Sequence, residues 1–375
     1  METKPALVLE DQNWSVITRF LPDDWRSKAK ELNACRRLRG ISSIDILLRM
    51  LMVHVSEGYS LIQTSNIARQ AGWATVSDVA LLKRLRSAEE WLRWMCVELA
   101  SRHHPGRLDF TKPQWLSAHR VRSFDATVIS EPGSTGTDWR IHYSLGLFDL
   151  YCHEFLLTDP STGEQISNFT LEPGDFVVAD RAYCNGKFIN ELAGGGADFL
   201  LRYKPRSVRL VAGPGDDQPL DVLAHCRLAE TGTPQSHLLS TSDGCRLRLL
   251  IHKKSPEAAE AARKVYLRDK RKKQKKINPD SVELQGYIIL ITSKTDPSVS
   301  TVDLLNLYRL RWQIELAFKR LKSIMGLGHL PKYDPHSCRA WLYGKLLTAL
   351  LVEVLVEHAR LFSPWGYPLD ANQPS

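Results

Sequence analysis

The hydrophobic pattern of this 375-residue chain changes its period twice, and this limits the folds that the chain can adopt. From about residue 40 to 105, apolar residues such as Ile44 and Leu48 recur at helical spacing. From about 117 to 203 the pattern is instead typical of short strands separated by Gly, Pro and Asp. Helical spacing then returns over 301–323 and 337–361. The sequence therefore predicts a helical N-terminal domain, a central sheet and a set of late helices.

The strand-like runs are short and mostly apolar. We expect strands at residues 120–128, 140–148, 155–158, 176–179, 199–203 and 287–291. The stretch 204–285 between the last two is rich in turns and charge and indicates an insertion. Its basic run, Lys270 to Lys276, either neutralises DNA phosphates without reading sequence or is simply a solvated loop. The final dozen residues, with three prolines, are expected to be a loose tail.

The charge and cysteine content narrow the class of protein. Lys and Arg number 50 against 42 Asp and Glu, so the net charge is +8, and the pI is near 9.1. This balance favours a polyanionic partner, although basic charge alone does not establish one. Seven scattered cysteines without a Cys-x-x-Cys pair give no sign of a zinc site or a redox couple, and a reducing cytosol fits them best. Neither a secretion leader nor a membrane span is expected.

Residues 65–85 suit a helix-turn-helix, with the turn at Gly72. The second helix would end in Lys83, Arg84 and Arg86, which could contact DNA. The alternative is an ordinary helical hairpin whose basic residues are solvated.

Two aspartates are placed on or beside predicted strands. Asp125 lies near the middle of an alternating strand, and Asp180 ends the apolar strand Asp-Phe-Val-Val-Ala-Asp. A carboxylate at the end of an apolar strand is costly unless a partner such as a metal ion stabilises it. Each aspartate taken alone is more often a turn or cap residue, so the pair becomes informative only with a third acid.

The third acid lies on the predicted helix 308–322. At about 100° per residue, one acid and several basic or aromatic side chains fall within an arc of roughly 60°: Tyr308, Arg311, Glu315 and Lys322, with Lys319 just beside it. The alternative is a solvent-exposed helix with salt bridges along its surface. Phosphoryl transfer explains the mixture of charges, because carboxylates hold Mg²⁺ while cations and Tyr grip the flanking phosphates.

The spacing Tyr308-x2-Arg311-x3-Glu315-x6-Lys322 resembles the Tyr-Arg-Glu-Lys signature of bacterial insertion-sequence transposases. These are the DDE enzymes of the insertion-sequence-four family, which are relatives of the Tn-five transposase. The segments around the two aspartates, residues 124–127, 139–142 and 179–183, also resemble that family in order and context. The likeness extends from about residue 40 to 362.

The resemblance implies an α/β fold: a ribonuclease-H-like mixed sheet flanked by helices, with a β-rich insertion and a helical N-terminal domain. The expected division is a helical DNA-binding domain at 1–112, the catalytic core at 113–203 and 286–362, the insertion at 204–285 and a tail at 363–375. Asp125, Asp180 and Glu315 would coordinate two Mg²⁺ or Mn²⁺ ions per active site.

The resemblance also implies a DNA surface around these acids. Tyr308, Arg311 and Lys322 would contact DNA near the cut, and we add Lys319 and Arg181 as neighbours. Three residues after the first catalytic strand either face DNA or pack in the sheet: Trp139, Arg140 and His142. We expect Trp139 and Trp312 to pack against other side chains of the protein. We do not expect them to hold a DNA base that is flipped out of the double helix.

The expected function is transposition in the bacterial cytoplasm, in association with the nucleoid. The partners would be double-stranded DNA, as terminal inverted repeats and as target, and a second copy of the chain in a dimer or larger synaptic complex. No membrane partner is expected. A metal-dependent nuclease without strand transfer and a non-catalytic DNA-binding derivative remain as alternatives.

Overall fold

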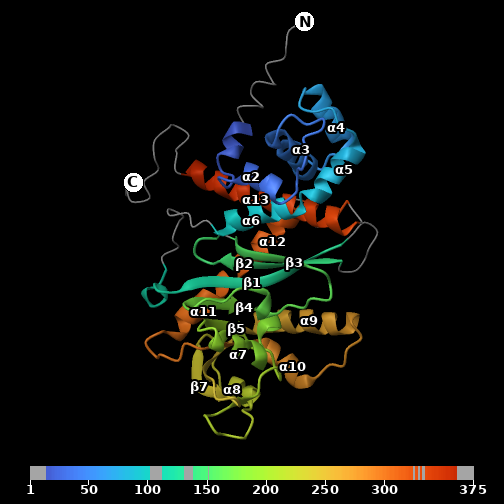
Figure 1. Ribbon diagram of the computed structural model, residues 1–375. Coiled ribbons are helices and arrows are strands. Elements are labelled where there is room, and N and C mark those ends of the chain that lie inside the picture. The colour runs from blue at the N-terminus through green and yellow to red at the C-terminus, as the bar shows by residue number, and fades with distance from the viewer. Residues whose placement is uncertain are drawn as a thin grey trace, which may run out of the picture.

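The computed structural model describes residues 14–101, 112–130, 138–150, 152–323, 326–327, 330–331 and 334–360. The helices of the N-terminal part gather at one end of the molecule together with the last helix, the strands follow, and the insertion lies at the opposite end (Figure 1). The predicted tail, residues 363–375, lies outside the described residues.

The described N-terminal helices are short, and three of them begin with a serine cap. Their bounds are α2 (Trp25–Glu31), α3 (Ile44–Ser56), α4 (Leu61–Gln70), α5 (Asp78–Ser87) and α6 (Glu89–Ser101). Ser43, Ser60 and Ser77 each accept a hydrogen bond from the backbone N–H three residues further on, which satisfies an otherwise unpaired donor at the helix start. Helical spacing and serine caps together explain why this region is mainly helical.

The helices α4 and α5 form the helix–turn–helix arrangement that the sequence predicts. The connecting turn begins at Ala71, and Gly72 has a φ of +72°, a left-handed conformation that favours glycine. The side chain of Lys83 on α5 is exposed, whereas Arg86 pairs with Asp334 at 3.0 Å.

The last helix, α13 (Pro335–Arg360), packs against α3, α5 and α6. Trp341 and Leu346 of α13 share one hydrophobic core with Leu47 and Trp91 of the N-terminal helices. The two ends of the chain thus build a single helical layer, although the sequence assigned the late helices to the catalytic core.

The described strands form one nine-stranded mixed sheet in the order β3-β2-β1-β4-β5-β9-β8-β7-β6. Strands β1, β4 and β5 are parallel neighbours, and the other pairs are antiparallel. The first five strands have the bounds β1 (Arg120–Ile129), β2 (Trp139–Gly146), β3 (Cys152–Thr158), β4 (Asp175–Ala179) and β5 (Asp198–Arg202). Each overlaps a strand that the sequence predicts.

The stretch 204–285 continues the central sheet. Its strands are β6 (Leu210–Val211), β7 (Gln235–Thr241) and β8 (Arg246–Lys253), and β8 pairs with β9 (Tyr287–Thr292), which in turn pairs with β5. The helices of this region are α8 (Val222–Arg227), α9 (Pro256–Lys272) and α10 (Pro279–Glu283). The insertion therefore contains more helix than strand, unlike the β-rich insertion that was expected, and its strands share the sheet of the core.

Two helices follow β9 where the sequence predicts one. They are α11 (Thr301–Leu310) and α12 (Trp312–Ser323), separated by Arg311. The backbone N–H of Arg311 bonds to the carbonyl of Tyr308, and that of Ile314 bonds to the carbonyl of Arg311. In both hydrogen bonds the donor lies three residues after the acceptor, as in a 3₁₀ helix. Such tight turns within a helix often occur at functional positions.

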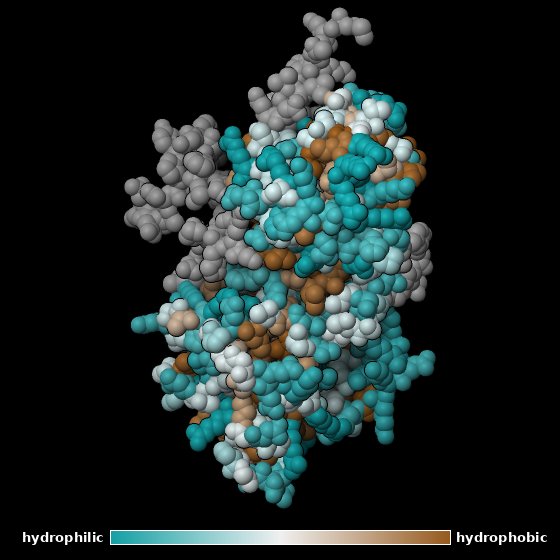
Figure 2. Space-filling model, in the orientation of Figure 1, coloured by the Kyte–Doolittle hydropathy of each residue, from teal (hydrophilic) through white to brown (hydrophobic). Residues whose placement is uncertain are grey.

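Hydrophilic residues cover most of the face seen in Figure 2, and apolar residues gather there in small areas. Within the described residues, no helix has the length and apolar character needed to cross a bilayer.

Candidate active site

Asp125 and Asp180 meet where β1 continues beyond the end of β4. Phe124 pairs with Ala179, the last residue of β4, so Asp125 is the first residue of β1 without a partner on that strand. Asp180 follows β4 directly and accepts a hydrogen bond from Ala182 N–H at 2.7 Å. This bond caps the short 3₁₀ helix η3 (Arg181–Tyr183) and fixes the carboxylate at the carboxyl edge of the sheet.

Arg311 links the helical acid to the first aspartate. Its guanidinium donates a hydrogen bond to Oε1 of Glu315, and its Nη1 lies 3.9 Å from Oδ2 of Asp125. The Arg311 side chain is 16% exposed, compared with 20% for Asp125 and 38% for Glu315. Asp125 and Glu315 are far apart in the sequence, and both thus contact the guanidinium of Arg311.

Negative charge accumulates around Asp125. Burial raises the pKa of Asp125 to about 7, and the nearby charge of Asp180 acts in the same direction. The N–H of Ala126, which donates to Asp125 at 2.8 Å, and the charge of Arg311 act against this rise. A carboxylate in this environment gains from any additional positive charge.

Within the described residues, no three His, Cys, Asp or Glu side chains lie close enough together to hold a metal ion. Arg311 stands between Asp125 and Glu315, so these acids can approach a common cation only if Arg311 turns away. The donor set itself consists of carboxylate oxygens, which are the ligands that Mg²⁺ and Mn²⁺ prefer.

A group of basic residues lies beside the acids. Arg202 ends β5, hydrogen-bonds to Tyr308 and donates to the carbonyl of Tyr287 at 3.5 Å. The Nζ of Lys254 donates to the carbonyl of Gln285 at 2.8 Å. Burial lowers the pKa of Lys254 to about 8, and the positive charges of Arg202 and Arg181 lower it further. These like charges favour an anionic ligand.

The predicted DNA-contacting residues of α11 and α12 differ in exposure. Lys319 and Lys322 are exposed. Tyr308 is half-buried, and its ring lies 5.8 Å from the guanidinium carbon of Arg311. Trp312 is 57% exposed, so the prediction that it packs is wrong for this residue.

The three residues on β2 lie mostly inside the protein. Trp139 is 8% exposed and packs in the core of the helical layer. His142 is fully buried between Thr158 and Asn168, and burial lowers its pKa to about 4, so it is neutral at pH 7. Arg140 donates a hydrogen bond to the carbonyl of Thr162. For Trp139 and His142 the structure favours packing over DNA contact, because neither side chain presents a charged or exposed surface.

Three residues of the site escaped the sequence prediction. Arg202 ends β5, which is parallel to β4, so both strands end at the same edge of the sheet. The position of Arg202 in the sequence could therefore have indicated that it lies beside Asp180. Lys254 directly follows β8 of the insertion, and only the sheet order brings it here. Glu164 lies in the turn after β3, and its charge acts on Asp125, but no sequence pattern marks it.

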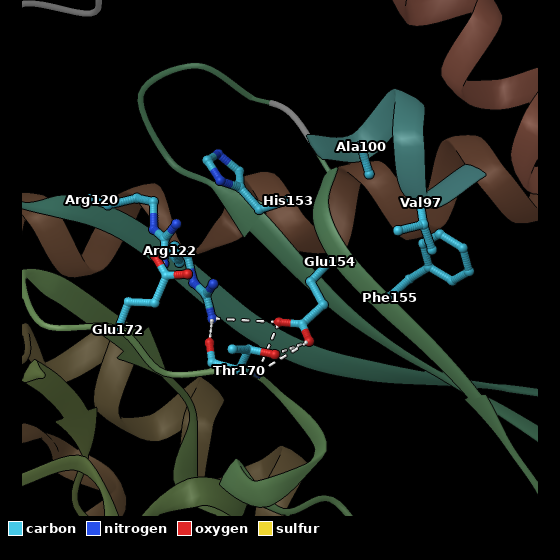
Figure 3. A pocket seen from close by; sticks show the side chains of 9 residues that line it. All are labelled: Val97, Ala100, Arg120, Arg122, His153, Glu154, Phe155, Thr170 and Glu172. Atoms are coloured by element: carbon cyan, nitrogen blue, oxygen red, sulfur yellow. Dashed lines mark hydrogen bonds and ion pairs between the residues drawn. The ribbon is translucent and has the colours of Figure 1, made fainter. Parts of the chain in front are cut away.

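A separate pocket of about 470 Å³ lies between α6, β1 and β3 (Figure 3). Arg122 enters it and donates to the carbonyl of Thr170 at 2.9 Å. Glu154 lies 3.8 Å from Arg122 and accepts hydrogen bonds from Thr170. Arg120 pairs with Glu172 at 2.9 Å in the same pocket. Glu154 and Glu172 thus neutralise Arg122 and Arg120. These contacts connect β1 and β3 to the segment before β4.

Comparisons with known proteins identify the family of the chain. The family described as "Transposase DDE domain" matches residues 158–351, which include Asp180 and Glu315. The chain is 30% identical to the transposase for insertion sequence element IS421 of Escherichia coli, over 94% of this chain and 96% of the relative. The proposed transposase InsL for element IS186A of Escherichia coli (strain K12) is equally similar, with the same coverage. A transposase for element IS231B of Bacillus thuringiensis subsp. berliner is 21% identical over 86% of this chain and 75% of the relative. The chain therefore belongs to the DDE transposase family and is an enzyme of that family.

Proposed function

We propose that this chain cleaves DNA at the ends of an insertion sequence and transfers the resulting 3′ hydroxyl ends to target DNA. Asp125, Asp180 and Glu315 would hold two Mg²⁺ or Mn²⁺ ions. The observation that carries the proposal is the contact of one guanidinium, that of Arg311, with both Asp125 and Glu315, beside the charge of Asp180.

The residues present suit such ions by their chemistry. The raised pKa of Asp125 reflects a buried carboxylate facing another acid, and a bound cation would stabilise its ionised form. When bound, a pair of such cations activates the attacking oxygen and stabilises the leaving oxygen. Arg311 would turn from the acids to a phosphate next to the scissile bond, since guanidinium groups bind carboxylates and phosphates in the same geometry.

The remaining cations would align the DNA. Arg181, Arg202 and Lys254 are partly exposed, and among the described residues none of them forms an ion pair with Asp or Glu. Lys319 and Lys322 would extend this surface along α12. Several phosphate contacts around one scissile bond would hold it in line for attack.

The N-terminal helices would bind the element end. Their support is the helix–turn–helix of α4 and α5, with exposed Lys83 on the second helix. The basic run Lys270 to Lys276 ends α9 and continues beyond it, and its residues are exposed from Arg271 onward. It would add contacts that do not depend on sequence. We retain the division into a DNA-binding domain, a catalytic core and an insertion as part of this proposal.

We further propose placement in the insertion-sequence-four family, with a ribonuclease-H-like core. Support comes from the spacing of Tyr308, Arg311, Glu315 and Lys322 and from a mixed sheet whose aspartate-bearing strands β1 and β4 are parallel neighbours. A dimer or larger synaptic complex would bring two element ends together. Since the substrate would be chromosomal DNA, the enzyme would act at the bacterial nucleoid.

The second candidate function is a nuclease of the same fold that cuts without joining. A strand-transfer assay with element ends and a target plasmid separates the two, because only a transposase forms joined product. Cleavage without joining would support the nuclease. A non-catalytic DNA-binding derivative would give neither product.

The metal-site assignment is tested by Asp180→Asn. Asparagine caps a helix as well as aspartate does, so η3 should persist while the negative charge is lost. Cleavage should disappear and binding of element ends should remain. The matched control is Asp159→Asn, because Asp159 also accepts a hydrogen bond from the N–H two residues on, at 2.8 Å, but in an exposed turn. Retained cleavage in Asp180→Asn would remove Asp180 from the site.

A further inference from the structure

Hydrogen bonds hold the turn after β3 against β2. Arg140 donates to the carbonyl of Thr162, and the Asn168 amide donates to the carbonyl of Gly163 at 2.9 Å. The same amide nitrogen lies 3.1 Å from Nδ1 of His142. These bonds fix the backbone immediately before Glu164, so the position of this acid is determined by the sheet.

The residues after Glu164 pack against the neighbours of both catalytic aspartates. Ile166 and Phe169 are 1% and 5% exposed and belong to the core that contains Phe124 and Ala179. The rings of Phe124 and Phe169 stack with their centroids 4.1 Å apart. Since Phe124 precedes Asp125 and Ala179 precedes Asp180, this packing holds the turn against the acidic end of the two strands.

Glu164 lies close enough to the two aspartates for their charges to interact. Its charge acts on Asp125, and the charge of Asp180 acts on Glu164. Burial is the main reason that the pKa of Glu164 is raised, and Arg140 is the basic group that opposes the rise. Across the described part of the chain, no hydrogen bond or ion pair holds the Glu164 carboxylate.

Within the part of the chain that the structure describes, the hydroxyl of Tyr183 is unpaired, and it lies near the same carboxylates. Tyr183 is fully buried, and its hydroxyl has no hydrogen-bond partner among the described residues. Burial raises the pKa of Tyr183, and the negative charges of Asp125, Glu164 and Asp180 raise it further. A buried hydroxyl is normally hydrogen-bonded, so a donor beside three carboxylates indicates a ligand or a rearrangement that completes the group.

We propose that Glu164 and Tyr183 are positioning residues of the cation site. Glu164 supplies a fourth carboxylate, which accepts hydrogen bonds from water molecules around a divalent cation held by Asp125 and Asp180. The Tyr183 hydroxyl donates a hydrogen bond that orients these carboxylates. This inference rests on the proposed function, and it assigns to the turn after β3 a direct effect on cation affinity.

The test measures Mn²⁺ binding to the full-length protein by titration calorimetry, with thermal unfolding recorded in EDTA and in Mn²⁺. Glu164→Gln should weaken Mn²⁺ binding by about 10- to 100-fold, which is the usual effect of removing an outer partner of a metal ligand. Tyr183→Phe should weaken it by a smaller factor. Glu164→Asp keeps the charge and should recover part of the lost affinity. Glu172→Gln is the matched control, since Glu172 is an exposed acid on the same segment, and it should bind Mn²⁺ normally.

The unfolding temperatures in EDTA and in Mn²⁺ distinguish a positioning role of Glu164 from a purely structural role. Because Glu164 is repelled by Asp180, Glu164→Gln should unfold in EDTA at the same or a higher temperature than the unaltered protein, and should gain less from Mn²⁺. A lower unfolding temperature in EDTA with an unchanged Mn²⁺ gain would overturn the proposal. So would Mn²⁺ affinities of Glu164→Gln and Tyr183→Phe within twofold of the unaltered protein.

Asp180→Asn distinguishes this inference from the proposed function. If Asp180→Asn loses Mn²⁺ binding and Glu164→Gln does not, the inference fails and the proposed metal site stands. If Asp180→Asn binds Mn²⁺ normally, the proposed metal site fails as well.

Discussion

Nη1 of Arg311 lies 3.9 Å from Oδ2 of Asp125, while the same guanidinium donates a hydrogen bond to Glu315. A single basic side chain thus partly neutralises two of the three proposed metal ligands. Its position one residue before α12, at a tight 3₁₀ turn, allows it to contact a strand and a helix together. A divalent cation held at the proposed site would compete with Arg311 for the same oxygens.

Replacing Arg311 with alanine should therefore change two measurements in opposite directions. Cleavage of element ends should fall by about 10- to 100-fold, because a charged hydrogen bond to phosphate is lost. The rise in unfolding temperature caused by Mn²⁺ should increase, because the competing guanidinium is gone. Arg309→Ala, at an exposed position two residues earlier, is the control. A smaller Mn²⁺ effect in Arg311→Ala would mean that Arg311 assembles the acids instead of competing for them.

Asp125→Asn should abolish cleavage and yet stabilise the protein at alkaline pH in EDTA. The pKa of Asp125 is raised to about 7 from the usual 3.8, so its contribution to the free energy of unfolding is present below about pH 4 and lost as the pH rises through about 7. At pH 8 the variant should be more stable by on the order of 1–3 kcal/mol. At pH 4 the difference should vanish. Denaturant unfolding at both pH values checks this, and a difference that does not depend on pH would contradict it.

Lys254 should make DNA binding depend on pH. Its pKa is lowered to about 8, so the side chain carries its charge below that pH and loses it above. We expect the affinity for a DNA duplex to fall between pH 7 and pH 9, and Lys254→Arg to remove that fall. At pH 7, Lys254→Gln should reduce the slope of log affinity against log salt by about 1. Anisotropy titrations measure both effects. Lys264→Gln is the control because Lys264 is 74% exposed and paired with Glu260; an equal effect there would exclude a specific role for Lys254.

Trp312 should contribute to DNA binding by stacking. It is 57% exposed and lies between Arg311 and Glu315 in sequence. An exposed aromatic ring beside phosphate-binding groups can stack on a base, which contributes about 1–3 kcal/mol. Trp312→Ala should weaken binding of element ends accordingly, Trp312→Phe should retain most of it, and neither should lower the unfolding temperature. Val302→Ala, which changes an exposed apolar residue on the preceding helix α11, should bind normally. Equal binding by Trp312→Ala and the unaltered protein would exclude stacking.

The central strands could be predicted from sequence because their signal is local. Apolar runs and alternation place β1, β4 and β5 within one or two residues of their observed bounds. The strands β7 and β8 were missed as separate elements because charged and polar residues interrupt them, as in Arg246–Lys253. The break at Arg311 was missed because helical periodicity passes through a single tight turn without interruption.

The sequence by itself determined which residues carry charge and how they are spaced: an aspartate on one strand, an aspartate ending another, and an acid among bases on a helix. Such patterns are local, since side-chain period depends only on backbone geometry. Only the tertiary structure decided that Arg311 contacts both Asp125 and Glu315, that Lys254 lies near Arg202, and that Glu164 lies near Asp180. Strand order and packing between distant segments set those contacts, and no local pattern encodes them.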